Sequence, residues 1–162
     1  MNISKLMDMQ AVLDRHIERK HGLETEDLVE RKVLALLVEL GELANETRCF
    51  KFWSLRGPSE RETILGEYVD GIHFLLSLAN ELSFKLTVPE MFTLEQRNLT
   101  EQFILLYREI SLFQQQVTFE SFQTVFTEYI RLGHMLGFSA IDVEQAYITK
   151  NEVNHERQQQ GY

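Results

Sequence analysis

Proline, glycine and cysteine are scarce in this chain of 162 residues. It holds two prolines and eight glycines, with no Ser/Gly-rich or low-complexity stretch, so the sequence offers no interdomain linker. An apolar fraction of 44% is enough to build one sizeable core at this length, and we expect a single domain over residues 1–162. The single cysteine, Cys49, cannot form an internal disulfide, which fits a reducing compartment.

Clusters of basic residues and long apolar runs are also missing. The formal net charge is −9, and without grouped Lys and Arg the chain has no surface suited to a phosphate backbone, so no nucleic-acid partner is expected. The first twenty residues, MNISKLMDMQAVLDRHIERK, carry a charge every few positions, which excludes a signal peptide or a membrane span there. We therefore predict a cytoplasmic protein with no membrane partner.

Apolar residues recur at spacings of three and four through most of the chain, and no alternating run is bounded by hairpin turns. This pattern predicts an all-α helical bundle with a four-helix core. We expect helices over about 4–20, 25–48, 59–82, 94–116, 119–136 and 139–158, with FKFW at 50–53 as a turn or short helix and a connection through Pro89. The expected stop and start signals are Gly22, Thr25, Ser59 with Glu62, Gly137, and Ser139 with Asp142.

Two of these predicted helices carry acidic residues at positions that border their apolar faces. LLVELGELANE, residues 36–46, contains Glu39 and Glu42, and LGEYVDGIHFLLSL, residues 65–78, contains Glu67 and Asp70. A spacing of three brings both members of each pair to one side of a helix. If the two helices pack antiparallel, the four carboxylates converge and repel one another unless a divalent cation lies among them. Oxygen-only ligands favour Mg²⁺ or Mn²⁺ over zinc.

Two other interpretations of the acids stay open at this point. A single acidic pair is common on solvated helix faces, so the chain could be a helical interaction module. Against this, Gly41, Gly66 and Gly71 lie beside the acids, and glycine weakens a helix unless a close approach needs it. The motifs Asp70-x-x-His73 and Glu152-x-x-His155 would instead suit a ferritin-like di-iron site, although the ExxE pair has no place in that pattern.

ExxE followed after roughly two dozen residues by ExxD resembles the metal signature of the all-α nucleoside triphosphate pyrophosphohydrolases, the group of MazG-like enzymes and dimeric dUTP diphosphatases (dUTPases). The surroundings resemble the dUTPase branch. FKFW follows the first pair, the second continues as DGIHF at 70–74, and the early helix holds QAVLD at 10–14. The most specific part is YITKNEVNHERQQQGY at 147–162, similar to the C-terminal motif of these enzymes.

The resemblance implies a homodimeric enzyme that hydrolyses dUTP to dUMP and pyrophosphate by attack of water on the α-phosphorus, with Mg²⁺ as cofactor and Mn²⁺ as a substitute. Glu39, Glu42, Glu67 and Asp70 would hold the metals, with Glu39 as candidate catalytic base and Glu42 as the alternative. The implied substrate-binding residues are Gln10, Asp14, Lys51, Trp53, His73, Phe74, Lys150, Asn154 and Arg157.

Side-chain chemistry fits several of these roles. The C-terminal trio at 150, 154 and 157 shares one helix face, where cations would suit a phosphate tail. Phe74 and Trp53 offer stacking surfaces and Gln10 an amide suited to uracil, although aromatic residues in such contexts are more often ordinary packing residues. His73 could contact the base, support a neighbouring residue or be a buried structural histidine. Asp14 stands where the dUTPase motif commonly has Asn, and a carboxylate cannot donate a hydrogen bond unless protonated. Other deoxynucleoside triphosphates, or the diphosphate, therefore remain candidate substrates.

Overall fold

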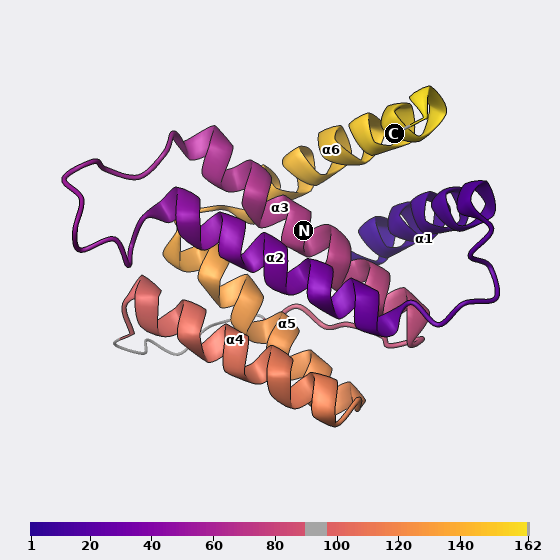
Figure 1. The fold of residues 1–162 in the computed structure, drawn as a ribbon, viewed down its shortest axis with the longest axis horizontal. Helices are drawn as coiled ribbons and strands as arrows, with labels where there is room; N and C mark the ends of the chain where they lie inside the picture. Colours follow the sequence, from indigo (N-terminus) through magenta and orange to yellow (C-terminus); the bar gives the residue numbers. More distant parts are fainter. Residues whose placement is uncertain (90–96, 162) are drawn as a thin grey trace.

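A computed structural model describes residues 1–89 and 97–161 of the chain (Figure 1). The described residues form helices and connecting segments without a strand, which confirms the all-α helical bundle. The helices are α1 (Ile3–His21), α2 (Val29–Thr47), α3 (Arg61–Glu81), α4 (Leu99–Gln115), α5 (Phe119–Met135) and α6 (Ala140–Gln160). Within the described ranges, no helix has the length and apolar character needed to cross a membrane.

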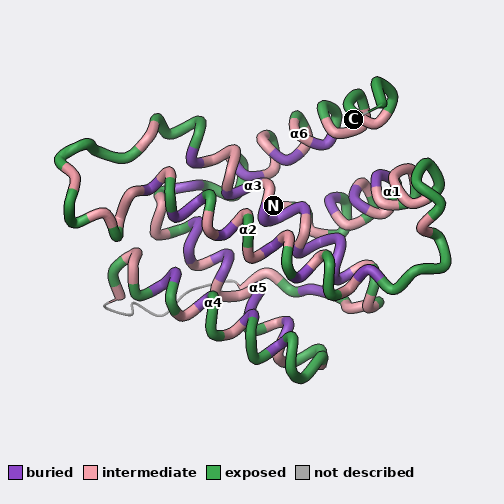
Figure 2. The backbone as a smooth tube through the Cα atoms, viewed as in Figure 1, coloured by how far each residue is buried: buried purple, intermediate pink, exposed green. Residues whose placement is uncertain are grey.

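Helix α3 is the central element of the bundle. It packs against α1, α2 and α6, while α4 packs on α5 and α2. Figure 1 shows α2 and α3 running side by side in opposite directions, which is the antiparallel packing that convergence of the acidic pairs requires. Most of the second half of α3 is buried, whereas exposed residues gather in the loop before it and at the free ends of α1 and α6 (Figure 2). The acids on α2 and α3 therefore border the main core.

Helix ends agree with the sequence signals in some places and differ in others. Gly22 ends α1 with φ +67°, and Ser139 caps α6 in a box with Asp142, both as expected. Thr25 is not a cap, because α2 begins only at Val29, whose N–H donates to Asp27 Oδ1 at 3.0 Å. The segment at 50–53 forms turns.

The predicted starts of α3 and α4 are also wrong. Ser59 does not cap α3: its N–H donates to the carbonyl oxygen of Glu46 at 3.0 Å and its hydroxyl to the Glu46 carboxylate, which ties the loop back to the end of α2. Helix α4 begins at Leu99, where Asn98 and Glu101 form a capping box. The predicted first residues of that helix, 94–96, lie outside the described residues.

Two glycines let α3 and α5 approach closely. A Cβ on Gly71 would lie 1.9 Å from the hydroxyl of Tyr129, and a Cβ on Gly133 would lie 2.5 Å from the Tyr68 ring. The two tyrosines stack with centroids 5.0 Å apart, and each hydroxyl donates to the other's carbonyl oxygen, at 3.3 Å from Tyr68 and 3.0 Å from Tyr129. Because Gly71 is adjacent to Asp70, this contact fixes the position of α3 next to that acid.

The other two glycines beside the acids differ from each other. Gly41 allows the Tyr107 hydroxyl to come within 3.0 Å of its would-be Cβ, and that hydroxyl donates to the carbonyl oxygen of Leu37 at 3.2 Å. Gly66 has open space, with no described atom within 4 Å of a would-be Cβ. Close approach therefore explains Gly41 and Gly71 but not Gly66.

Candidate active site

Three carboxylates from two antiparallel helices meet between α2 and α3. Glu39, Glu67 and Asp70 each offer one oxygen, and these oxygens lie within 4.8 Å of one another. All three side chains are half-buried, so none is a freely solvated acid. Glu42, the fourth predicted ligand, is exposed and stands outside this close group. We call the three residues the acidic cluster.

Crowding in the acidic cluster changes its proton affinity. Burial, followed by the charges of Asp70, Glu42 and Glu67, raises the pKa of Glu39 to about 7 from an ordinary 4.5, while Lys150 opposes the rise. Burial and the charges of Asp70 and Glu42 also raise the pKa of Glu67. Without added positive charge the cluster holds a proton near neutral pH, which is the response expected of carboxylates forced together.

Lys150 supplies a positive charge from a third helix. Its Nζ lies 2.6 Å from Asp70 Oδ2 and joins α6 to α3. One ammonium against three carboxylates leaves the site short of positive charge. The cluster is therefore suited to a divalent cation, whose preferred ligands are oxygens.

A cavity of about 390 Å³ adjoins the acidic cluster and shares Glu39 and Asp70 with it. Besides Glu39 of α2, three helices line it with the same spacing of i, i+3 or i+4, and i+7: α1 from Gln10, α3 from Asp70 and α6 from Lys150. Seven of the nine predicted substrate-binding residues lie in its wall, namely Gln10, Asp14, His73, Phe74, Lys150, Asn154 and Arg157. The sequence interpretation missed Leu13, Ile17 and Ser77, which extension of the same periodic stripes would have found.

Lys51 and Trp53 are not part of this wall. They lie in the turns after α2, in the loop that Figure 1 places at the end of the bundle away from the free ends of α1 and α6. The Trp53 side chain is 64% exposed and packs edge-to-face on Phe52, with centroids 5.0 Å apart. Lys51 donates to the side-chain oxygen of Asn45. The structure therefore does not bring these two residues to the cavity.

Gln10 is already engaged by protein groups. Its Nε2 donates to Asp14 Oδ1 at 2.8 Å, and its Oε1 accepts from the Tyr147 hydroxyl at 2.6 Å and lies 2.8 Å from His73 Nδ1. Burial, followed by Lys150, lowers the pKa of His73 to about 3, so its ring is neutral. The buried Gln10 side chain thus orients Asp14, His73 and Tyr147 through its polar contacts.

The two DxxH and ExxH motifs do not form a common metal site. His155 stacks on His16 of α1, with centroids 5.5 Å apart and their Nδ1 atoms 3.3 Å apart, and Glu152 is exposed. Among the described residues, the group with suitable ligand distances is the oxygen-only acidic cluster. The structure therefore gives no support to a di-iron centre.

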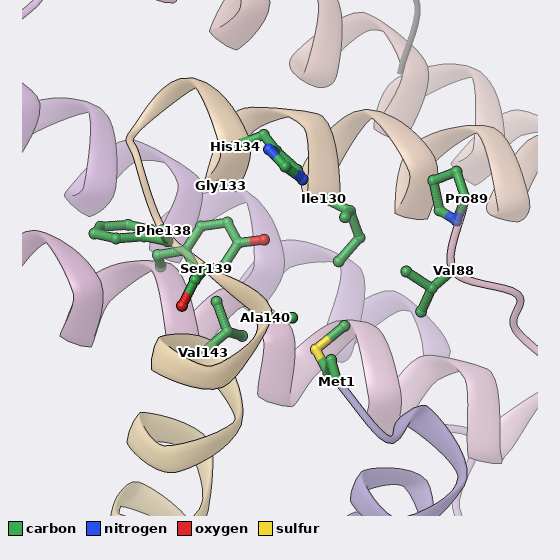
Figure 3. Close-up of a pocket in the computed structure, with 11 residues that line it drawn as sticks. Met1, Val88, Pro89, Ile130, Gly133, His134, Phe138, Ser139, Ala140 and Val143 are labelled. Carbon is green, nitrogen blue, oxygen red and sulfur yellow. The ribbon is translucent and has the colours of Figure 1, made fainter. Parts of the chain in front are cut away.

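A second cavity lies where α5 turns into α6 (Figure 3). It measures about 80 Å³, and its wall is mainly apolar, including Met1, Ile130 and Phe138. No carboxylate, lysine or arginine among the described residues lines it, and it is too small for a nucleotide.

Comparison with known proteins agrees with the geometry. The family described as dUTPase matches residues 2–162, which is nearly the whole chain. A comparison with curated proteins found no match. The family match extends over both acidic helices and over all the helices that line the cavity beside the acidic cluster. The chain belongs to the dUTPase family.

Proposed function

We propose that the protein hydrolyses dUTP to dUMP and pyrophosphate in a Mg²⁺-dependent reaction in which water attacks the α-phosphorus. The observation that carries the proposal is the acidic cluster opening onto a cavity of about 390 Å³, a volume typical of small-molecule sites. Membership of the dUTPase family supports dUTP as the substrate. Mn²⁺, which takes the same oxygen ligands, is the expected substitute.

The acidic cluster has the ligand chemistry that Mg²⁺ requires. Glu39, Glu67 and Asp70 would hold the ion through carboxylate oxygens, with Glu42 joining from its exposed position on the next turn of α2. When bound, Mg²⁺ would neutralise charge on the phosphoryl oxygens of the substrate. The fit rests on the oxygen-only donors and on crowding strong enough to raise the pKa of Glu39 to about 7.

The protein groups have separate tasks in this proposal. Glu39 would orient the attacking water and accept its proton, a task suited to a carboxylate beside the metal and the reacting phosphoryl group, and Glu42 is the alternative. Lys150, Asn154 and Arg157 follow one face of α6 into the cavity, where they would bind the triphosphate. Phe74 offers its ring to the base from α3.

Product analysis with matched variants tests the proposal. Wild type should release pyrophosphate and dUMP from dUTP only when Mg²⁺, or Mn²⁺ as its substitute, is present. Glu39→Gln and Glu42→Gln should each lower kcat by at least about a hundredfold, as loss of a base or metal ligand does. Glu46→Gln is the control on the same helix, because Glu46 holds Ser59 and lies outside the acidic cluster. Release of inorganic phosphate, or equal damage from Glu46→Gln, would contradict the proposed chemistry or ligand set.

We also propose that the protein is a homodimer that associates through α2 and α4. These helices pack against each other and carry large apolar side chains that are exposed in the single chain. Leu34 and Val38 lie one turn apart on α2, and Ile104 and Leu112 are two turns apart on α4. Grouped exposed apolar side chains are typical of a contact surface, and a two-fold dimer would cover the same surface on both copies.

A further inference from the structure

A surface groove of about 520 Å³ lies along α1 where this helix faces His155 of α6. It shares no residue with the cavity beside the acidic cluster. Apart from Val12, every described residue that lines it has a basic side chain. We call it the basic groove, and its basic residues are Arg15, His16, Arg19 and Lys20 of α1 and His155 of α6.

The basic groove and the cavity occupy different faces of α1. Positions 12, 15, 16, 19 and 20 line the groove, whereas positions 10, 13, 14 and 17 line the cavity. Asp14 and Glu18 interrupt the basic residues in the sequence, but Asp14 belongs to the cavity wall and Glu18 Oε1 lies 3.8 Å from Lys32 Nζ of α2. The helical fold therefore gathers a cluster of basic residues that the linear sequence does not show.

The protein itself leaves most of the charge in the basic groove unbalanced. The side chains of Arg15 and Lys20 are exposed and form neither an ion pair nor a hydrogen bond with any described residue. Arg19 Nε lies 3.6 Å from Glu24 Oε1, and both of these side chains are more than half exposed, so their pair contributes little stability. Because no described carboxylate lines the groove, a multivalent anion would supply the missing negative charge.

Two histidines join the α1 and α6 sides of the basic groove. Nδ1 of His16 lies 3.3 Å from Nδ1 of His155, so one ring donates from Nδ1 and the other accepts there. The accepting ring carries its hydrogen on Nε2, and neither Nε2 atom is hydrogen-bonded to a described residue. Burial, followed by His16, lowers the pKa of His155, which disfavours two positive charges on the pair. The histidine pair therefore offers an N–H donor to a ligand in the groove.

A metal ion is disfavoured at the same histidine pair. Two ring nitrogens supply only two ligands, and among the residues that the structure describes, the group of three or more suitable ligands is the acidic cluster. The cationic side chains of Arg15, Arg19 and Lys20 in the groove would also repel a metal cation. The charge of the wall therefore selects an anion.

We propose that the basic groove is a binding site for a di- or triphosphate group, separate from the cavity beside the acidic cluster. The guanidinium groups of Arg15 and Arg19 and the ammonium group of Lys20 donate charge-assisted hydrogen bonds to phosphoryl oxygens. The volume of about 520 Å³ is typical of small-molecule sites. A dimer formed through α2 and α4 leaves the groove open, since α1 packs on α3 and α6. This inference does not depend on the proposed reaction.

Proton NMR of the histidine C2–H signals, assigned by single substitutions, separates the two sites. His16 and His155 line the basic groove, whereas His73 lines the cavity beside the acidic cluster. Inorganic pyrophosphate is added to the full chain in EDTA at constant ionic strength. We expect the signals of His16 and His155 to shift and saturate, while that of His73 stays unchanged over the same range. The double variant Arg15→Gln/Lys20→Gln should weaken this binding at least about tenfold, because it removes two charged donors.

The double variant Arg31→Gln/Lys85→Gln is the matched control. It removes the same charge from exposed positions outside the basic groove and should keep the wild-type affinity for pyrophosphate. Signals of His16 and His155 that stay unchanged or fail to saturate, a shift confined to His73, or equal weakening in the control would overturn the inference.

A parallel titration with UDP distinguishes the sources of the phosphate group. Tighter binding of UDP than of pyrophosphate, read at His16 and His155, would identify a nucleotide as the ligand, and equal affinity would identify the inorganic ion. Both titrations measure binding without turnover. Failure of the protein to hydrolyse dUTP would therefore contradict the proposed function and leave the basic groove to be judged on these titrations alone.

Discussion

Replacing Glu39 with Gln should stabilise the protein at pH 8 when divalent cations are removed. The folded state raises the pKa of Glu39 to about 7 from 4.5, chiefly through burial and then through the neighbouring acids. Between these two values the folded protein keeps a proton that the unfolded chain has lost, so wild-type stability falls as pH rises from about 4.5 to about 7. Gln cannot ionise, and the variant avoids this loss.

The magnitude follows from the same pKa difference. The step from 4.5 to about 7 corresponds to about 3 kcal/mol if none of it is screened. Because Glu39 is only half-buried, solvent and salt reduce the repulsion, and we expect a gain of about 1–2 kcal/mol at pH 8. At pH 4.5 Glu39 is protonated in the folded state and half-protonated in the unfolded chain, so the stabilities of wild type and variant should differ by less than about 0.5 kcal/mol.

Urea denaturation in EDTA at pH 4.5 and pH 8 measures this difference through the free energy of unfolding. Glu152→Gln is the control, since it removes one exposed charge from α6 and should leave the stability close to that of wild type. With millimolar Mg²⁺ the order should reverse, because the ion stabilises a native state that retains the full acidic cluster. An Glu39→Gln variant that is less stable than wild type at pH 8 in EDTA would refute the account of the crowded acids.

Two further predictions concern packing and assembly. Gly71→Ala should lower the free energy of unfolding by about 1–3 kcal/mol, since its Cβ would lie 1.9 Å from the Tyr129 hydroxyl. Gly66→Ala, on the same helix with open space, should raise it by up to about 1 kcal/mol, and equal losses in the two variants would contradict the contact. Light scattering should give a mass of about 38 kDa, twice the 19.1 kDa of one chain, and Ile104→Glu should lower it whereas Thr124→Glu on α5 should not. A wild-type mass of about 19 kDa at micromolar concentration would contradict the dimer.

Helices were predictable from the sequence because their apolar periodicity is local, but several of their ends were not. Gly22 and Ser139 act as expected, since a cap needs only partners within its own turn. Ser59 has a suitable sequence for a cap, yet it bonds to Glu46 thirteen residues earlier. When a side chain has two possible hydrogen-bond partners, the path of the loop determines which one it bonds. The local sequence does not specify that path.

The residues of the candidate site also differ in whether local sequence patterns could predict them. Residues that follow a helical stripe, such as Asp70 and His73, lie in the wall of one cavity because the spacing of a helix determines its faces. The hydrogen bond from Tyr147 to Gln10 joins residues far apart in the chain, so no local pattern indicates it. Trp53 was assigned to the substrate by the resemblance, but the turns after α2 leave it exposed. Long-range contacts therefore decide which predicted residues meet.

Repulsion among Glu39, Glu67 and Asp70 can relax in two ways, by moving α2 away from α3 or by adding positive charge. Movement is opposed by the packing of α2 on both α3 and α4, while α3 is held in place by α1, α6 and the Gly71–Tyr129 contact next to Asp70. Added charge is the remaining route, and at neutral pH in the absence of a cation it takes the form of a proton on Glu39. A divalent cation relieves the same repulsion without movement of either helix. The rigid core beside the acids therefore keeps the ligands in place before the ion arrives, which is the condition for a preorganised metal site.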